Sequence, residues 1–157
     1  MEPSFTIITG ALGGLGSTFA YECASRGSNL ILIDRSHEGQ PLLEYLTENF
    51  PVEIQFYLCD LADHAARSDL FQKLSNKGFH YKGLINVVGQ EIEREFLTLT
   101  REELRYMLHL NLEAMIDLSL FALNHHDPDQ KFRLINVASL AGFFPIPHKA
   151  VYSSSKR

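Results

Sequence analysis

Short runs of apolar and β-branched residues alternate along the chain with longer stretches of helical period. This alternation favours parallel strands joined by crossover helices, and therefore an α/β fold. We expect five strands, at Phe5–Thr9, Leu30–Asp34, Glu53–Cys59, Gly83–Val88 and Arg133–Ala138. We expect helices at Leu15–Ser25, Gln40–Asn49, Ala62–Ser75 and Arg101–Leu123.

Glycines and capping residues mark the ends of these predicted helices. Gly27 and Gly78 each follow a helical stretch, at the place where a left-handed residue ends a helix. Thr100 and Glu103 have the spacing of a capping box, which predicts the start of the longest helix. That helix, Arg101–Leu123, is apolar on more than one face, so we expect it to be buried or to pack against a second copy of the chain.

The composition is that of an ordinary globular domain. The chain has 157 residues, of which 45% are hydrophobic and 21% are charged. A chain of this length buries about 70% of the surface that its unfolded form exposes, which is enough for a core without disulfides or metal. We therefore expect a single domain over residues 1–157. The net charge of -5 offers no broad positive surface, which argues against nucleic acid and membrane surfaces as partners.

The start of the chain and its cysteines bear on location. Residues 1–4 bring no basic region before a long apolar run, and no apolar run approaches the ~20 residues of a bilayer span. Cys23 and Cys59 lie far apart in apolar stretches, where a buried thiol acts as a small hydrophobic side chain. Because no cysteine framework exists, we expect a reducing, cytoplasmic compartment.

A glycine-rich segment, TGALGGLG at residues 9–16, lies between the first predicted strand and the first predicted helix. Glycine lets the backbone turn tightly and approach a pyrophosphate, and the N–H groups at the helix start attract its charge. Such a loop alone is equally often structural. Asp34 strengthens the prediction of a dinucleotide site, because it ends the second strand 18 residues after Gly16, close to the spacing of a ribose-binding carboxylate.

Asp34 also bears on the choice of dinucleotide. A carboxylate at this place accepts hydrogen bonds from the ribose hydroxyls and repels a 2′-phosphate, which favours NAD over NADP. Arg35 leaves NADP possible. Its guanidinium lies over the adenine, pairs with a 2′-phosphate or is a solvated surface charge.

Tyr152 and Lys156 are four residues apart in a segment that is predicted to begin a helix, so both side chains lie on one face. An ammonium beside a phenol lowers the pKa of the tyrosine toward neutrality, as a general acid/base requires. This spacing often arises by chance. Ser139, 13 residues before Tyr152 at the end of the fifth predicted strand, makes a catalytic role more plausible.

Together these motifs resemble the short-chain dehydrogenase/reductase family. They occur in the family's order over essentially the whole chain. The residues that carry the resemblance are Thr9, Gly10, Gly14, Gly16, Asp60, Leu61, Asn86, Gly89, Asn111, Ser139, Tyr152 and Lys156. The chain departs from the family at Val87 and Val88, where an Asn and an Ala are usual.

The resemblance implies a Rossmann-type doubly wound parallel sheet in the order 3-2-1-4-5 and hydride transfer between NAD, or NADP, and a small-molecule carbonyl or alcohol. The residues implied to bind the cofactor are Thr9, Gly10, Leu12, Gly14, Leu15, Gly16, Asp34, Arg35, Asp60, Leu61, Asn86, Gly89, Tyr152 and Lys156. The residues implied to be catalytic are Asn111, Ser139, Tyr152 and Lys156.

The resemblance also implies a role for each catalytic residue. Tyr152 exchanges a proton with the substrate oxygen, while Lys156 lowers the pKa of Tyr152 and binds the nicotinamide ribose. Ser139 holds the substrate oxygen, and Asn111 interrupts the long helix to anchor a relay water. Two alternatives stay open: Asp60, implied to contact the adenine, is only the cap of the next helix, or Asn111 is only a tolerated polar residue.

Members of the family are commonly longer than this chain, so we expect it to be the N-terminal part of a longer enzyme, or else a non-catalytic dinucleotide-binding fragment. A group of apolar residues before Tyr152 favours an apolar substrate, although ordinary loop packing explains it equally well. This group is Leu140, Phe143, Phe144, Pro145 and Ile146. We expect no metal site, because His125, His126 and Asp127 follow a helix as a solvated turn.

Overall fold

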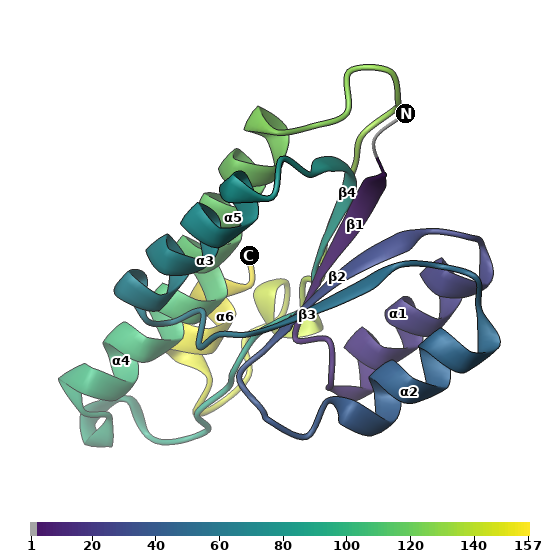
Figure 1. Ribbon diagram of the computed structural model, residues 1–157. Helices are drawn as coiled ribbons and strands as arrows, with labels where there is room; N and C mark the ends of the chain where they lie inside the picture. Colours follow the sequence, from purple (N-terminus) through teal and green to yellow (C-terminus); the bar gives the residue numbers. More distant parts are fainter. Residues whose placement is uncertain (1–2) are drawn as a thin grey trace.

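The computed structural model describes residues 3–157 and contains a five-stranded parallel sheet (Figure 1). The strands are β1 Ser4–Thr9, β2 Asn29–Asp34, β3 Ile54–Leu58, β4 His80–Asn86 and β5 Arg133–Asn136. Their order, β3-β2-β1-β4-β5, and their parallel pairing confirm the predicted topology. Met1 and Glu2, which entered the prediction about the start of the chain, lie outside the described residues.

Helices cover both faces of this sheet (Figure 1). On one face lie α1 Gly14–Ser25 and α2 Gln40–Asn49. On the other face lie α3 His64–Asn76, α4 Arg101–Leu108 and α5 Ala114–Asn124, and α6 Ala150–Ser155 follows β5 near the C-terminus. The central strands thus have a packed layer on each side, as parallel strands require, whereas all four residues of β5 are exposed.

Alternate residues of the central strands point into two separate cores. In β2, Ile31 and Ile33 pack with residues of α3 and α5, whereas Leu30 and Leu32 pack with residues of α1 and α2. All four side chains are 0% exposed. The apolar runs of the sequence therefore reflect strands that are buried on both faces.

Several predicted boundaries were wrong by one to three residues. The strand predicted at Gly83–Val88 is β4, which begins at His80, because His80 and Tyr81 continue the pairing with β1. It ends at Asn86, because the N–H groups of the next two residues bond the Thr9 hydroxyl instead of a strand. The helix predicted from Ala62 begins later, because Asp63 caps it by accepting hydrogen bonds from two backbone N–H groups.

The other differences are shifted strand ends and two short helices. The strand predicted at Glu53–Cys59 is Ile54–Leu58, and the one predicted at Arg133–Ala138 stops at Asn136. Single-turn 3₁₀ helices at Phe96–Thr98 and Leu140–Gly142 were not predicted. The predicted helix ends are confirmed at Gly27 and Gly78, whose φ angles are +74° and +66°.

The longest helical run starts at the predicted capping box, in which Thr100 and Glu103 each bond the other's backbone N–H. A π-helical turn, His109–Glu113, interrupts the run between α4 and α5. Contrary to the prediction, the run Arg101–Asn124 is long and apolar enough to cross a membrane, by length and composition only. Its inner face belongs to the core of the sheet, and core helices meet the same two criteria.

The junction between β1 and α1 depends on two glycines in direct backbone contact. A Cβ atom on Gly16 would lie 2.0 Å from the carbonyl oxygen of Gly10. Gly10 has a φ of +63°, and a Cβ there would lie 3.1 Å from the backbone of Val88. Three segments, namely the loop after β1, the start of α1 and the end of β4, therefore meet at distances that only glycine permits.

We predict that Gly16→Ala lowers the free energy of unfolding by about 2 kcal/mol or more, because the new methyl group has to displace backbone. Gly14→Ala is the matched control, since a Cβ at Gly14 meets nothing within 4 Å. This control should be neutral or up to about 1 kcal/mol more stable. Urea unfolding followed by circular dichroism measures both, and equal effects of the two substitutions would contradict the role assigned to Gly16.

Candidate functional site

An open cleft of about 520 Å³ lies at the carboxyl ends of β1 to β4. In doubly wound sheets, this edge is where ligands bind. Ten of the residues predicted to bind the cofactor line it: Gly10, Leu12, Gly14, Leu15, Gly16, Asp34, Arg35, Asp60, Leu61 and Gly89. The structure therefore brings together residues that lie up to 79 positions apart in the sequence.

The start of α1 forms one wall of this cleft. Gly13, the N-cap of α1, lines the cleft together with Gly14, Leu15 and Gly16. A glycine cap has no side chain to occupy the N–H groups of the first turn, and the acidic residues that often stand in a first turn are absent from α1. This wall is suited to bind an anionic group such as a pyrophosphate.

Asp34 ends β2 at the edge of the cleft, as predicted. Its Oδ2 atom accepts the backbone N–H of Leu12 at 2.9 Å, and its Oδ1 atom accepts that of Ser36 at 3.0 Å. The carboxylate is thereby fixed between the glycine-rich loop and the segment after β2. It keeps further lone pairs for a ribose hydroxyl.

Arg35, Tyr106 and Asp60 form a hydrogen-bonded series at the cleft. The Nη1 atom of Arg35 donates to the Tyr106 hydroxyl at 2.6 Å, and that hydroxyl lies 3.4 Å from both carboxylate oxygens of Asp60. Burial, and then the charge of Asp60, raises the pKa of Tyr106 above its ordinary value. Sequence reasoning missed Tyr106, because one aromatic residue in a polar helical turn gives no distinctive signal.

The alternative that Asp60 only caps α3 is wrong. The N-cap of that helix is Asp63. Asp60 instead lines the cleft, and its Oδ1 atom accepts the backbone N–H of Ala62 at 2.9 Å. This bond holds the turn that carries Leu61, which was also predicted to bind the cofactor.

Thr9 and Asn86, two further predicted cofactor residues, are buried and do not belong to the residues that line the cleft. The Thr9 hydroxyl accepts the backbone N–H groups of Val87 and Val88 at 3.1 and 3.2 Å. Asn86 donates from Nδ2 to the side-chain oxygen of Asn136 at 2.9 Å. Both residues therefore hold the ends of neighbouring strands in place beneath the cleft.

Asn111 lies in the π-helical turn and is 2% exposed. Its Oδ1 atom accepts the backbone N–H of Gln90 at 2.8 Å, and its Nδ2 atom donates to the carbonyl of Gln90 at 2.9 Å and to the Ser155 hydroxyl at 3.0 Å. These bonds contradict the alternative that Asn111 is merely tolerated. They connect the loop after β4 to α6.

Lys156 and Tyr152 belong to the C-terminal helix α6 and its cap. The Lys156 ammonium donates to the carbonyl of Val137 at 3.2 Å, and burial lowers the pKa of Lys156. A Cβ on Gly89 would lie 2.7 Å from this ammonium nitrogen, so the lysine reaches the edge of the cleft that Gly89 lines. Tyr152 is partly buried one helical turn earlier.

Ser139 stands three residues after the end of β5 and is partly buried. Its hydroxyl accepts the backbone N–H of Ala141 at 3.2 Å, which starts the short 3₁₀ turn after β5. The predicted catalytic residues thus come from the π-helical turn, the segment after β5, and α6 with its cap. None of the four is among the residues that line the cleft itself.

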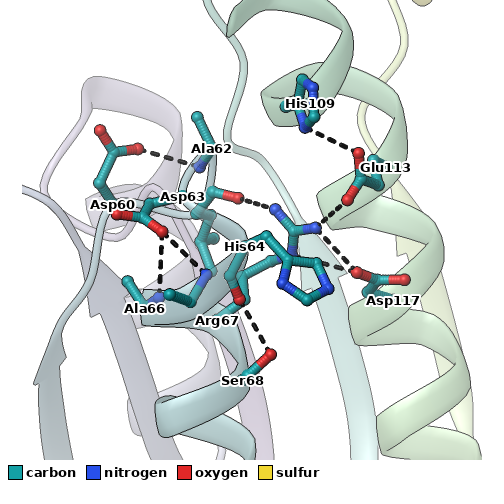
Figure 2. Close-up of polar contacts among 12 residues, drawn as sticks. Asp60, Ala62, Asp63, His64, Ala66, Arg67, Ser68, His109, Glu113 and Asp117 are labelled. Atoms are coloured by element: carbon teal, nitrogen blue, oxygen red, sulfur yellow. Dashed lines mark hydrogen bonds and ion pairs between the residues drawn. The ribbon is translucent and has the colours of Figure 1, made fainter.

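A buried arginine that the sequence did not single out, Arg67, lies against the carboxylates of Glu113 and Asp117 (Figure 2). Arg67 is 1% exposed, and its Nη1 atom donates to the carbonyl of Leu61 at 2.6 Å. Its Nε and Nη2 atoms bond Asp117 at 3.1 and 2.9 Å, and Nη2 also pairs with Glu113. His109 bonds the other oxygen of Glu113 at 2.8 Å.

Arg67 and its partners Leu61, Glu113 and Asp117 form a cluster that connects two parts of the site. Leu61 lines the cleft, and Glu113 ends the π-helical turn that contains Asn111. Asp117 and Glu113 follow Arg67 by 50 and 46 residues, so no local sequence pattern could have indicated the pairing. Each of the three nitrogens of this buried guanidinium has a partner, as a buried charge requires.

The histidines at the end of α5 bond the backbone instead of each other. His125 Nδ1 lies 2.9 Å from the carbonyl of Phe121, and His126 Nδ1 lies 2.8 Å from that of Leu123. Asp127 accepts hydrogen bonds from the two residues that follow Pro128. This arrangement agrees with the predicted turn at a helix end.

The family model for short chain dehydrogenases matches residues 4–157. The human 17-beta-hydroxysteroid dehydrogenase type 3 is 26% identical over 97% of this chain and 49% of its own length. The very-long-chain 3-oxoacyl-CoA reductase of Vanderwaltozyma polyspora is 30% identical over 98% of this chain and 47% of its own. The chain thus spans about half the length of the curated relatives it matches.

Two similar solved structures contain nicotinamide cofactors. One is 4-hydroxyisoleucine dehydrogenase with NADH, 25% identical, with a TM-score of 0.84 over 98% of this chain and 62% of that one. The other is a short-chain dehydrogenase from Sphingobium yanoikuyae with NADPH, 25% identical, with a TM-score of 0.88 over 98% of this chain and 60% of that one.

We predict that Arg67→Met lowers the free energy of unfolding by about 1–3 kcal/mol, because the Leu61 carbonyl and two carboxylates lose their buried donor. Arg26→Met is the control, since the Arg26 pair with Glu22 is exposed and its loss should cost no more than about 1 kcal/mol. Urea unfolding at neutral pH gives both values. Equal losses would show that the buried pairing adds nothing to the fold.

Proposed function

The chain belongs to the short-chain dehydrogenase family, and we propose that it forms the nicotinamide-binding domain of an oxidoreductase that interconverts a carbonyl and an alcohol. One observation carries the proposal. Lys156, the partner of the candidate acid/base Tyr152, reaches Gly89 at the edge of a cleft that the glycine-rich loop and Asp34 also line. The groups that we propose to bind the dinucleotide and to carry the proton would therefore meet at one edge of the sheet.

The lining residues suit an NAD(P) cofactor. The first turn of α1 offers N–H groups for the pyrophosphate, Asp34 offers its carboxylate to the adenosine ribose, and Asp60 with Leu61 forms the opposite wall. A bound nicotinamide would supply or accept the hydride. The residues of this chain orient it and manage one proton.

In the proposed mechanism, Tyr152 exchanges a proton with the substrate oxygen and Ser139 donates a hydrogen bond to that oxygen. The Lys156 ammonium binds the nicotinamide ribose, one helical turn after Tyr152. Asn111 holds Gln90 and Ser155 in place by three hydrogen bonds, which supports α6 where it carries the acid/base pair.

We propose NAD as the preferred cofactor. The Asp34 carboxylate stands at the end of β2, and Glu38 and Asp60 also line the cleft. These charges would repel a 2′-phosphate. Among the cleft-lining residues that the structure describes, Arg35 is the one whose charge would attract it.

We propose an apolar substrate, which the loop before α6 supports. Leu140, Phe143 and Phe144 are 74%, 76% and 64% exposed, so packing within the loop does not account for them. The relatives named for hydroxysteroid and very-long-chain acyl substrates agree with a large apolar ligand.

We also propose a reducing, cytoplasmic location, which the free Cys23 and the buried, free Cys59 support.

We propose that a second copy of the chain packs against the long helix. Leu108, Leu112, Ile116 and Leu120 repeat every fourth residue from α4 to α5 and are 41% to 60% exposed. They form a continuous apolar stripe on the side of the helix away from the core. A symmetric pairing of two such stripes would bury both.

We predict that Tyr152→Phe in the full enzyme reduces kcat by about 10²–10⁴-fold and leaves NADH affinity unchanged, because the ring still packs but no proton is carried. NADH oxidation with bulky apolar ketones measures kcat, and fluorescence titration measures binding. Tyr45→Phe, at an exposed tyrosine of α2, is the control. A fully active Tyr152→Phe enzyme would exclude this mechanism, and wild-type binding without turnover would instead favour a binding-only protein.

We predict that the chain self-associates and that Ile116→Glu weakens this association by about 10-fold or more, because a carboxylate would be buried between apolar stripes. Leu97→Glu is the control, at a leucine that is 94% exposed in the 3₁₀ turn before α4. Light scattering over a concentration series gives the mass. A wild-type chain that stays monomeric throughout would contradict the second copy.

A further inference from the structure

The sequence leaves three possible roles for Arg35, and its contacts in the structure argue against one of them, the pairing with a 2′-phosphate. Its guanidinium reaches Tyr106, 71 residues further along the chain on α4, and donates to the hydroxyl at 2.6 Å. A guanidinium that is bound there is drawn toward the Asp60 side of the cleft. Because Arg35 directly follows Asp34, the same side chain would otherwise be the nearest cation to the ribose.

The Tyr106 hydroxyl is suited to hold Arg35 on that side. Because its oxygen accepts a hydrogen bond from Arg35, its own hydrogen is free to point to the Asp60 carboxylate, whose two oxygens lie 3.4 Å away. The hydroxyl thus lies between a cation and an anion and can satisfy both. Charge-assisted hydrogen bonds of this kind are the stronger ones in proteins.

The charges near Asp34, where we propose that the adenosine ribose binds, make the position of Arg35 decisive for the choice between NAD and NADP. Asp34 is fixed by the N–H groups of Leu12 and Ser36, so it cannot turn away from a ligand without breaking them. Glu38 adds a second carboxylate to the same lining. Among the described residues that line the cleft, Arg35 is the only lysine or arginine.

We propose that Tyr106 is a specificity-determining residue, which withholds Arg35 from the ribose 2′-position and so makes the cleft select a 2′-hydroxyl over a 2′-phosphate. This inference rests on the proposed dinucleotide function of the cleft. Asp34 supplies repulsion at the 2′-position, and Tyr106 removes the cation that would offset it. Specificity then comes from a residue of α4 that need not touch the 2′-position.

The test uses two ligands that contain only the adenosine half of each cofactor, 5′-AMP and adenosine 2′,5′-bisphosphate, with calorimetric titration of the full chain. Wild type should bind 5′-AMP more tightly. Tyr106→Phe keeps the ring but removes the hydroxyl, and it should improve the affinity for the bisphosphate relative to 5′-AMP by about 3- to 10-fold. Tyr45→Phe on α2 is the matched control and should leave this ratio unchanged.

A second variant shows whether Arg35 is the cause. In the Arg35→Gln background, Tyr106→Phe should no longer improve bisphosphate binding, because no cation is left to release. An unchanged ratio in Tyr106→Phe, or an equal gain with and without Arg35, would overturn the role of Tyr106 while leaving the cofactor site intact. Failure of wild type to bind either ligand would overturn the dinucleotide function itself, and the inference with it.

Discussion

The backbone contact between Gly16 and Gly10 is the constraint on which the site depends. Because α1 approaches the loop after β1 so closely that a Cβ would lie 2.0 Å from a carbonyl oxygen, the first turn of α1 directly lines the cleft. Gly10 in turn lies directly against the backbone of Val88, just after β4. A larger residue at either position would push α1, and the cleft wall that it forms, away from the strand ends.

Two hydrogen-bonded centres extend this constraint to the rest of the site. Arg67 holds the carbonyl of Leu61 on the cleft side and the carboxylate of Glu113 at the end of the π-helical turn. Asn111, within that turn, holds Gln90 and Ser155. The wider π turn therefore belongs to a continuous set of contacts that connects the Leu61 side of the cleft to α6. A substitution at Arg67 or at Asn111 should therefore affect both the Leu61 side of the cleft and α6.

Most of the fold could be predicted from the sequence, because its signals are local. The order of strands and helices followed from hydrophobic period, the capping box from Thr100 and Glu103, and two helix ends from glycine. The glycine loop and Asp34 were also identified from spacing, and both line the cleft. Strand and helix ends were less well predicted, because side chains such as Asp63 and Thr9 decide where backbone pairing stops.

The sequence by itself thus determined the glycine-rich wall and the carboxylate of Asp34 at the end of β2, since both depend on the fixed geometry of a βαβ unit, while the sheet order followed from the resemblance to a known family. Only the tertiary structure decided the contact of Arg35 with Tyr106 and the pairing of Arg67 with Asp117. These partners lie 71 and 50 residues apart. A charged residue carries no sequence signal for its partner across such a distance, because the pairing is set by which helices the sheet brings together.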